Sequence, residues 1–353
     1  MVAVLITGGA GYIGSHACKA LAQAGHQPIA FDNLCRGLAE AVRWGPLETG
    51  DIRDGERLDA VFKTYRPEVV MHFAANTEVG ASVADPAPFY TNNVGGTLNL
   101  LDAIRRHGVR HVVLSSTCAI YGAPAIMPID ERTPAAPINP YGVTKLAAEH
   151  AVRDYGSAYG IGWVALRYFN AAGADEDGHL GERHELATLA IPRAIRAALG
   201  LGPPFAIFGT DYPTPDGSAI RDYIHVDDVA EAHVRTLNYL LAGGGSTAIN
   251  LGSGSGTSVL EMLAAVERAA GRSMRPEHHP RRAGDPAMLY ASVDKAACLL
   301  GWQPLRSDID TIVASAARWI MSGTAGLFGY GMALPTGHRT GRNFVAVLDF
   351  QNL

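Results

Sequence analysis

Cysteines are few in this sequence and lie far apart. Cys18, Cys35, Cys118 and Cys298 are spread along 353 residues, and no two of them form a C-x-x-C pair. Zinc ribbons and the disulfide frameworks of small secreted domains need closely spaced, repeated cysteines. The sequence therefore predicts neither, and it favours reduced thiols in a cytoplasmic protein.

An excess of charge of one sign is also absent. The chain has 29 Lys and Arg against 34 Asp and Glu, a formal net charge of −5, and 48% of its residues are hydrophobic. This composition is too apolar and too evenly charged for a disordered chain. It offers no basic field to a phosphate backbone, so we expect no nucleic-acid partner.

Long hydrophobic runs are missing as well. The apolar run at 2–6 follows no charged leader and is too short for the core of a signal peptide. The uncharged stretch 112–129 is interrupted by serine, glycine and proline, which is typical of a strand followed by a loop. We therefore expect a soluble protein with no membrane partner.

Short β-rich runs alternate with helical patterns in the first half of the chain. Apolar residues recur at helical spacing from Ile13 to Ala24, and Gly25 ends that pattern. Strands separated by helices of this length indicate an α/β fold, a doubly wound parallel sheet with helices on both faces. We expect strands at 2–6, 29–32, 69–73, 111–115 and 164–169, a further strand before Asp51, and helices at 13–24 and 94–104.

A glycine-rich turn follows the first of these strands. Gly8, Gly11 and Gly14 form a G-x-x-G-x-x-G run, which lets the backbone approach a pyrophosphate at the helix N-terminus. Asp32 ends the second strand, 18 residues after Gly14. A carboxylate there can accept hydrogen bonds from both ribose hydroxyls and repel a 2′-phosphate. The pattern predicts a Rossmann-type domain with NAD, rather than NADP, as cofactor; the alternative for Asp32 is a turn residue before Asn33.

A phenol and an ammonium stand four residues apart in the middle of the chain. Tyr141 and Lys145 would share one face of a helix, after a strand that ends in Ser116 and Thr117. A free tyrosine titrates near roughly pH 10, so a base at neutral pH needs its pKa lowered by about three units. A lysine cation and an oxidised nicotinamide both favour the phenolate. Tyr141, Lys145 and Thr117 are the candidate catalytic residues, with Thr117 or Ser116 supplying a hydroxyl to the reacting substrate oxygen.

The second half is less regular. We expect a strand at 205–208 and helices near 227–241, 257–270 and 308–321, the middle one opened by a capping box at Ser258 and Glu261. The predicted domains are 1–170 for NAD binding, including the Tyr/Lys helix, and 171–321 for the substrate, a smaller mixed α/β domain with segments returning to the first. The helical pattern stops at Thr324, and the tail 322–353 carries no functional signal.

Four longer motifs make the chain resemble the extended short-chain dehydrogenase/reductase family, and within it the 4-epimerases of UDP-glucose and UDP-galactose. The resemblance covers about residues 2–321, in the family's order. Its markers are Thr7-Gly8-Gly9-Ala10-Gly11-Tyr12-Ile13-Gly14-Ser15-His16, Arg167-Tyr168-Phe169-Asn170, Arg221-Asp222-Tyr223-Ile224-His225-Val226 and Arg281-Arg282-Ala283-Gly284-Asp285.

The resemblance implies a role for particular positions. The expected NAD site has these residues: Gly8, Gly11, Tyr12, Ile13, Gly14, Asp32, Asn33, Leu34, Cys35, Arg36, Gly37, Asp51, Ile52, Phe73, Ala74, Ala75, Asn93, Lys145 and Phe169. Thr117 and Tyr141 would contact the reacting sugar hydroxyl. Asn170, Arg221 and Arg282 would hold the UDP pyrophosphate, Phe208 would lie by the uracil, and Asp285 would bind the uridine ribose. Two guanidiniums suit a dianion, although either arginine alone could form a surface ion pair.

Two positions depart from the family or leave its specificity open. Relatives often have lysine where this chain has Thr77, which puts a cofactor-phosphate contact there in doubt. Leu289 occupies the position whose bulk is associated with admitting or excluding N-acetylated sugars, and leucine is intermediate in size. Two other features read as structural: His278-His279 as an exposed loop rather than a metal site, and Cys118 as a packing residue.

The combined hypothesis is redox-neutral interconversion of UDP-glucose and UDP-galactose at C4. Epimerases of UDP-N-acetylglucosamine, UDP-xylose/UDP-arabinose or UDP-glucuronate are alternatives, as is a non-catalytic NAD-sensing protein. A 4,6-dehydratase is disfavoured because Cys118-Ala119 stands where that subgroup has an Asp-Glu pair. The resemblance also implies a homodimer.

Overall fold

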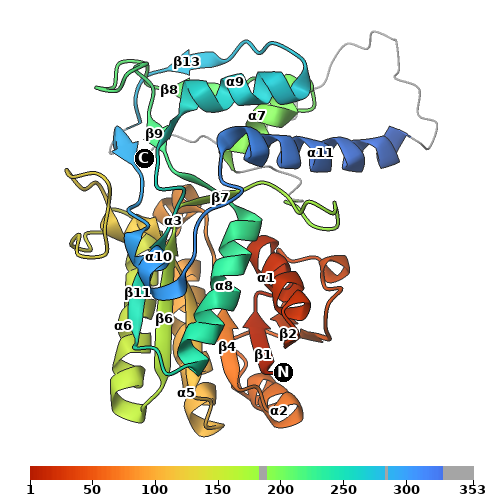
Figure 1. Cartoon of the computed structure of the whole chain (residues 1–353), viewed down its shortest axis with the longest axis vertical. Coiled ribbons are helices and arrows are strands. Elements are labelled where there is room, and N and C mark those ends of the chain that lie inside the picture. The colour runs from red at the N-terminus through yellow and green to blue at the C-terminus, as the bar shows by residue number, and fades with distance from the viewer. Residues whose placement is uncertain (183–188, 283–284, 329–353) are drawn as a thin grey trace.

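A parallel sheet forms the centre of the N-terminal lobe in the computed structural model, which describes residues 1–182, 189–282 and 285–328 (Figure 1). Its seven strands lie in the order β11-β6-β5-β4-β1-β2-β3, and every neighbouring pair is parallel. The predicted Rossmann-type sheet is thereby confirmed. In chain order the strands are β1 (Ala3–Thr7), β2 (Gln27–Asp32), β3 (Leu47–Thr49), β4 (Val69–His72), β5 (His111–Thr117), β6 (Gly162–Tyr168) and β11 (Thr247–Leu251).

Helices cover both faces of this sheet because its strands are apolar on both sides. In β1, Val4 and Ile6 pack with helices α1 and α8, whereas Leu5 packs on the opposite face with α2, α5 and α6. The covering helices are α1 (Tyr12–Gln23), α8 (Val226–Leu241) and α10 (Asp294–Leu300) on one face, and α2 (Gly55–Tyr65), α5 (Thr97–Arg106) and α6 (Pro140–Tyr159) on the other. The strand order reverses between β1 and β4, and open α/β sheets bind ligands at the carboxyl edge of such a point.

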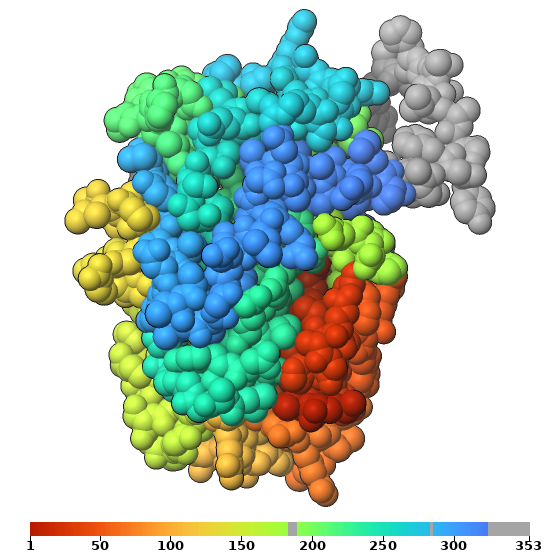
Figure 2. Space-filling model, viewed as in Figure 1, coloured from red at the N-terminus to blue at the C-terminus, as the bar shows by residue number. Residues whose placement is uncertain are grey.

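A smaller lobe lies over that carboxyl edge (Figures 1 and 2). Its core is formed by buried residues of α7 (Ala190–Ala198), α9 (Val259–Ala270) and α11 (Ile309–Phe328). Three small sheets accompany this core: β7 (Asn170–Ala172) with β10 (Tyr223–His225), β9 (Ile220–Arg221) with β12 (Thr257–Ser258) and β14 (Met288–Leu289), and β8 (Ala206–Phe208) with β13 (Glu277–His279), the last at the end of the lobe far from the large sheet (Figure 1). The predicted capping box is present, since Ser258 and Glu261 satisfy each other's backbone N–H groups.

Short helical segments lie between β4 and α5 and after β2 and β5. They are η1 (Ala39–Ala41), α3 (Val79–Ala84), α4 (Ala87–Phe89), η2 (Tyr90–Gly96) and η3 (Cys118–Tyr121). The segment η2 is a π-helical turn, so the regular helix predicted from residue 94 begins at Thr97. No helix among the described residues is long and apolar enough to cross a bilayer.

Two sequence predictions in the C-terminal half are wrong. Helix α11 continues to Phe328 instead of stopping at Thr324. Its first turns are fixed by Ile312 and Ala316 in the C-terminal core, and adding residues to an established helix costs little even where their helix propensity is weak. His278 and His279 lie on the exposed strand β13, paired with Ile207 and Phe208, rather than in a loop. The rest of the predicted tail, 329–353, and Ala283-Gly284 of the arginine motif lie outside the described residues.

Candidate active site

The glycine turn joins the end of β1 to helix α1. Its Gly8 and Gly14 positions are too close to neighbouring backbone for any side chain larger than hydrogen. Gly8 has a φ of 75°, and a Cβ there would lie 2.7 Å from the backbone nitrogen of Ala74. A Cβ on Gly14 would overlap the carbonyl oxygen of Gly8. Gly11 is the N-cap of α1 and brings no side chain to it, so the first N–H groups of the helix stay available to an anion. The turn therefore fits a dinucleotide pyrophosphate.

Asp32 is buried beside this turn, at the end of β2. It is 8% exposed, and its carboxylate accepts hydrogen bonds from the backbone N–H groups of Ala10 at 3.0 Å and Leu34 at 2.8 Å. Burial raises the pKa of Asp32, while these two bonds oppose that rise. Leu34 has a φ of 59°, which folds the loop after β2 back towards the carboxylate. This places an acceptor next to the turn, as the recognition of a ribose requires.

Other predicted cofactor residues surround this pair. Asn33 donates to Asp51 at 2.9 Å, and Arg53, whose hydrogen bonds are the main cause, holds the pKa of the Asp51 carboxyl below its usual range. Ile52 is buried, close to Gly96. The loop residues Cys35, Arg36 and Gly37 follow directly after Leu34, and Phe73, Ala74 and Ala75 follow β4 on the other side of Gly8.

Two predicted cofactor residues also have structural partners. Asn93 is buried, and its amide nitrogen donates to the Asn76 carbonyl at 2.9 Å and to the Thr144 hydroxyl at 3.1 Å. It thereby connects the segment after β4 to the catalytic helix. Tyr12 donates its hydroxyl to the carbonyl of Gly173 at 2.7 Å, while Ile13 packs against the sheet.

The three candidate catalytic residues meet at the end of β5 and the first turns of α6. Helix α6 begins there because Asn139 caps it, accepting from the N–H of Gly142 at 2.8 Å, with Pro140 as the first helical residue. Thr117, Tyr141 and Lys145 are all buried, with exposures of 8%, 9% and 4%. The Thr117 side chain hydrogen-bonds the Tyr141 hydroxyl, which favours the phenolate. The backbone of Tyr141 is fixed by Ser82 of α3, whose hydroxyl accepts from its N–H.

Burial governs the charge state of this group. It raises the pKa of Tyr141 to about 12, against the hydrogen bond from Thr117, and it lowers the pKa of Lys145 to about 8, against the field of Glu149. The pKa lowering that a tyrosine base needs is therefore not supplied by the protein groups alone, because desolvation outweighs them. At neutral pH Lys145 is still mostly a cation and can favour the phenolate.

A buried polar network that the sequence analysis did not assign lies behind these residues. Glu149, one helical turn after Lys145, accepts two hydrogen bonds from Arg167 of β6, at 2.9 and 2.6 Å. Arg167 also donates to Tyr121 at 2.9 Å, and Ser116 donates to Glu149. The sequence could have indicated the proximity of Glu149 to Lys145, since residues four apart lie on one face of a helix. The partner of Glu149 on β6 was not visible from local sequence.

The predicted substrate residues of the C-terminal lobe include two arginines, Arg221 and Arg282, with different partners. Arg221 pairs with Asp285 at 2.5 Å and also donates to the carbonyl of Pro286. The guanidinium of Arg282 lies 3.8 Å from the ring centre of Phe208. Partial burial and the charges of Arg193 and Arg221 lower the pKa of Arg282, which shows that three guanidiniums share this region. Arg193, on α7, is a cation that the sequence analysis missed.

Cys118 connects the two halves of the site. It follows Thr117 directly and packs on the same apolar cluster as Leu289, which pairs with Arg221 between β14 and β9. Burial raises the pKa of the Cys118 thiol to about 12, and the side chain packs at the edge of an apolar cluster, as predicted. Cys118 and Leu289 thus link the end of β5 to the strand that carries Arg221.

The remaining predicted residues border that space. Phe169 is buried in the cluster that Cys118 and Leu289 also contact. Leu289 stands opposite Arg221 in the pairing of β14 with β9. Asn170 is exposed and donates from its side chain to the Asp222 carbonyl at 2.9 Å. The structure therefore places residues of both predicted groups around one another.

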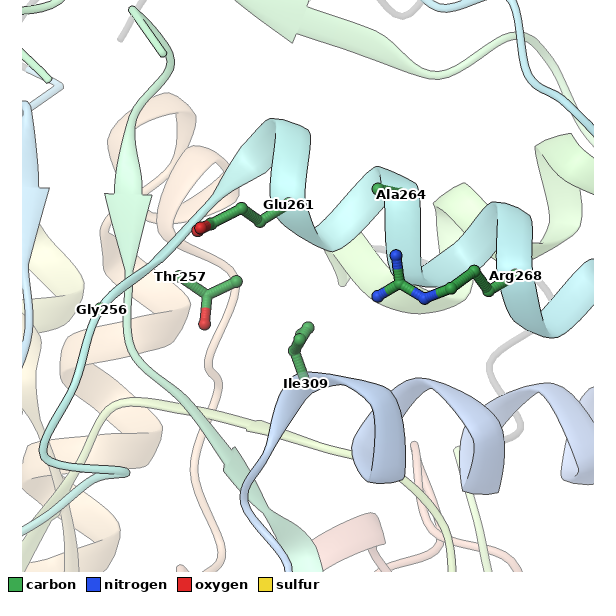
Figure 3. Close-up of a pocket in the computed structure, with 6 residues that line it drawn as sticks. All are labelled: Gly256, Thr257, Glu261, Ala264, Arg268 and Ile309. Atoms are coloured by element: carbon green, nitrogen blue, oxygen red, sulfur yellow. The ribbon is translucent and has the colours of Figure 1, made fainter. Parts of the chain in front are cut away.

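Two further features lie elsewhere. A hollow of about 310 Å³ is lined by Gly256, Thr257, Glu261, Ala264, Arg268 and Ile309, between α9 and α11 (Figure 3), and includes none of the predicted site residues. Asp175, Asp177 and His179 are close enough to share an ion, but Lys19 donates to both carboxylates.

Comparison with known proteins places this geometry in a family. Residues 4–252 match the NAD dependent epimerase/dehydratase family. The chain is 54% identical over 316 residues to a UDP-glucose 4-epimerase of Rhizobium meliloti, an alignment covering 90% of this chain and 96% of the relative. It superimposes on the UDP-glucose 4-epimerase of Brucella ovis in complex with NAD with a TM-score of 0.89 and 52% identity, covering 90% and 98% of the two chains. For the UDP-Glc/GlcNAc 4-epimerase of Campylobacter jejuni the TM-score is 0.81 at 39% identity, covering 91% and 100%. The chain belongs to the NAD dependent epimerase/dehydratase family.

Proposed function

We propose that this protein is an NAD-dependent isomerase that interconverts UDP-glucose and UDP-galactose by inverting C4 of the sugar. The observation that carries the proposal is the connection between the two groups: Cys118, which follows Thr117, packs on the same apolar cluster as Leu289, and Leu289 pairs with Arg221. This arrangement can hold a diphosphate at one end while a hydroxyl reacts at the other. The similarity to UDP-glucose 4-epimerases supports this substrate.

Each part of the site would have a separate task. When bound, NAD supplies a reversible hydride acceptor at the sugar C4 and a positive nicotinamide ring that favours a phenolate. Tyr141 would take the proton of the 4-hydroxyl at its Oη and return it after inversion, while the Thr117 hydroxyl holds the same oxygen. Lys145 would stabilise the phenolate. Burial of all three excludes water from the proton transfer.

Binding energy would be concentrated on UDP rather than on the sugar. Arg221 and Arg282 would hold the diphosphate, Phe208 the uracil and Asp285 the uridine ribose, which leaves the 4-keto sugar free to turn about its bond to UDP. A net-acidic protein can bind an acidic ligand in this way because the guanidiniums of Arg193, Arg221 and Arg282 lie close enough to influence one another.

The arginine group gives a prediction for substrate binding. Arg221 already donates to Asp285 and Pro286, whereas Arg282 stacks on Phe208, so the second is the cleaner probe. Arg282→Met should raise KM for UDP-galactose by about 10- to 100-fold with kcat changed less than about threefold, because it removes binding shared by ground and transition states. Steady-state kinetics measure this, with Arg272→Met as a control of equal charge. A lowered kcat at unchanged KM would contradict the assignment.

A panel of UDP-sugars tests the substrate itself. We expect UDP-glucose and UDP-galactose to be interconverted, with UDP-xylose, UDP-glucuronate and UDP-N-acetylglucosamine as the comparison substrates. UDP-N-acetylglucosamine is the second candidate, because Leu289 lines the site beside Arg221 and the Campylobacter jejuni relative is named for both sugars. Preference for another UDP-sugar would reassign the substrate, and silence across the panel would favour a non-catalytic NAD-binding protein.

The assembly and location are further parts of this proposal. Leu98 of α5 and Tyr159 of α6 are exposed apolar residues on neighbouring helices, and this face is the candidate for a symmetric interface between two copies of this chain. Light scattering on the purified protein measures the expected homodimer. Four free cysteines suit the reducing cytoplasm.

A further inference from the structure

Two arginines stand next to the predicted ribose site, and both are held by carboxylates. Arg36 lies four residues after Asp32, in the loop that follows β2. Its Nη1 lies 2.7 Å from Oε1 of Glu78 and its Nη2 lies 3.2 Å from Oε2, so the contact is bidentate. Arg53 is held in the same manner by Asp51, at 2.8 and 2.7 Å. The cations around Asp32 are therefore already neutralised by neighbouring carboxylates.

The Arg36–Glu78 pair joins the loop after β2 to the segment after β4. Glu78 is the N-cap residue of α3, after β4, and is separated from Arg36 by 42 residues. The loop that carries Arg36 lies against the glycine turn, because the N–H of Leu38 donates to the Ala10 carbonyl at 3.0 Å. In the same loop, a Cβ on Gly37 would lie 2.9 Å from Oδ1 of Asp32. Arg36 thus belongs to the loop that packs directly against the Asp32 carboxylate, the predicted ribose-binding group.

This position matters for the choice between two dinucleotides. An arginine near the end of β2 is the usual partner of the 2′-phosphate in enzymes that use NADP. In this chain such a phosphate would meet the Asp32 carboxylate and an arginine whose charge is compensated by Glu78. Arg36 could reach the phosphate only by leaving Glu78, and the Glu78 carboxylate would then lose a charged partner.

We propose that Glu78 is a cofactor-specificity residue that keeps Arg36 away from a 2′-phosphate and so reinforces the preference of Asp32 for NAD. The inference rests on the NAD site described above. It assigns a function to a residue after β4, outside the loop in which dinucleotide preference is ordinarily decided. It also explains how a chain with an arginine in that loop can remain selective for the dinucleotide without the extra phosphate.

A double-mutant cycle with dinucleotide affinity as its readout tests the inference. Dissociation constants of NAD and NADP are measured by calorimetry for the wild-type protein, Glu78→Gln, Arg36→Ala and the double variant. Glu78→Gln should lower the dissociation constant of NADP by about three- to fivefold and change that of NAD by less than about twofold, since a freed guanidinium can then contact the phosphate. Adding Arg36→Ala should remove the gain.

Matched controls separate this effect from a general change of charge. Glu231→Gln removes a carboxylate that pairs with Arg235 on α8 at 2.7 Å, a half-buried pair, and should leave the NADP-to-NAD ratio of dissociation constants unchanged. An unchanged ratio in Glu78→Gln, or a gain that persists without Arg36, would overturn the inference. If the wild-type protein bound neither dinucleotide, the NAD site itself would be wrong, which is a distinct outcome.

Discussion

Tyr141→Phe is expected to lower kcat for UDP-galactose by about 10²- to 10⁴-fold while NAD remains bound. The variant loses only the hydroxyl that would carry the proton, and proton transfer by a positioned side chain contributes about this much. Because the ring is 9% exposed and stays in place, the fold should be retained. A coupled assay measures the rate, and absorbance of the denatured supernatant measures the bound NAD.

A neighbouring tyrosine provides the matched control. Tyr168 is also buried, on β6, and its hydroxyl hydrogen-bonds Ser115. Tyr168→Phe should keep kcat within about threefold of the wild type, because it removes an equal group with no part in proton transfer. A Tyr141→Phe protein that held NAD and turned over at the wild-type rate would show that the mechanism is wrong.

Glu149→Gln is expected to reduce the free energy of unfolding by about 3–5 kcal/mol. The carboxylate and its partner Arg167 are only 7% and 12% exposed, and removal of one member of a buried pair leaves the other charge uncompensated. Chemical denaturation measures the loss. The double variant Glu149→Gln/Arg167→Met should be clearly more stable than the sum of the single losses predicts, since neither charge then remains. Additive losses would show that the two side chains do not act as a pair.

Glu149→Gln should also change the pH dependence of kcat, which a simple loss of stability would not do. Burial lowers the pKa of Lys145, and the charge of Glu149 raises it. The net pKa is about 8. Activity that needs the lysine cation is lost as pH rises through this pKa. Removal of Glu149 lowers the pKa further, so the alkaline limb of the kcat profile should move to lower pH. An unmoved alkaline limb would restrict Glu149 to a structural role.

The sheet and the ends of its strands could be predicted from the sequence because both depend on local pattern. Runs such as 2–6 and 111–115 are apolar on both faces, which identifies them as buried strands. Asp32 and Thr117 could be assigned to the site because each is the last residue of such a strand. The carboxyl ends of parallel strands lie at one edge, so the order of motifs already implied a common site.

Pairings between distant residues could not be predicted in this way. Arg36 with Glu78, Arg167 with Glu149 and Arg221 with Asp285 each join elements that meet only in the folded chain. The charge state of Tyr141 was also beyond the sequence, since it depends on desolvation by groups from several elements. Helix α11 passed its predicted end because its packing against α9 is a tertiary effect.

Proton NMR of UDP-galactose incubated with the purified protein and NAD in D₂O tests the central claim most directly. Redox-neutral inversion at C4 predicts that UDP-glucose forms, that the same mixture is reached from either sugar, and that hydrogen, not deuterium, is retained at C4. Deuterium at C4 would indicate inversion by exchange of a carbon-bound proton with solvent and would contradict the account. Absence of UDP-glucose under these conditions would contradict it as well.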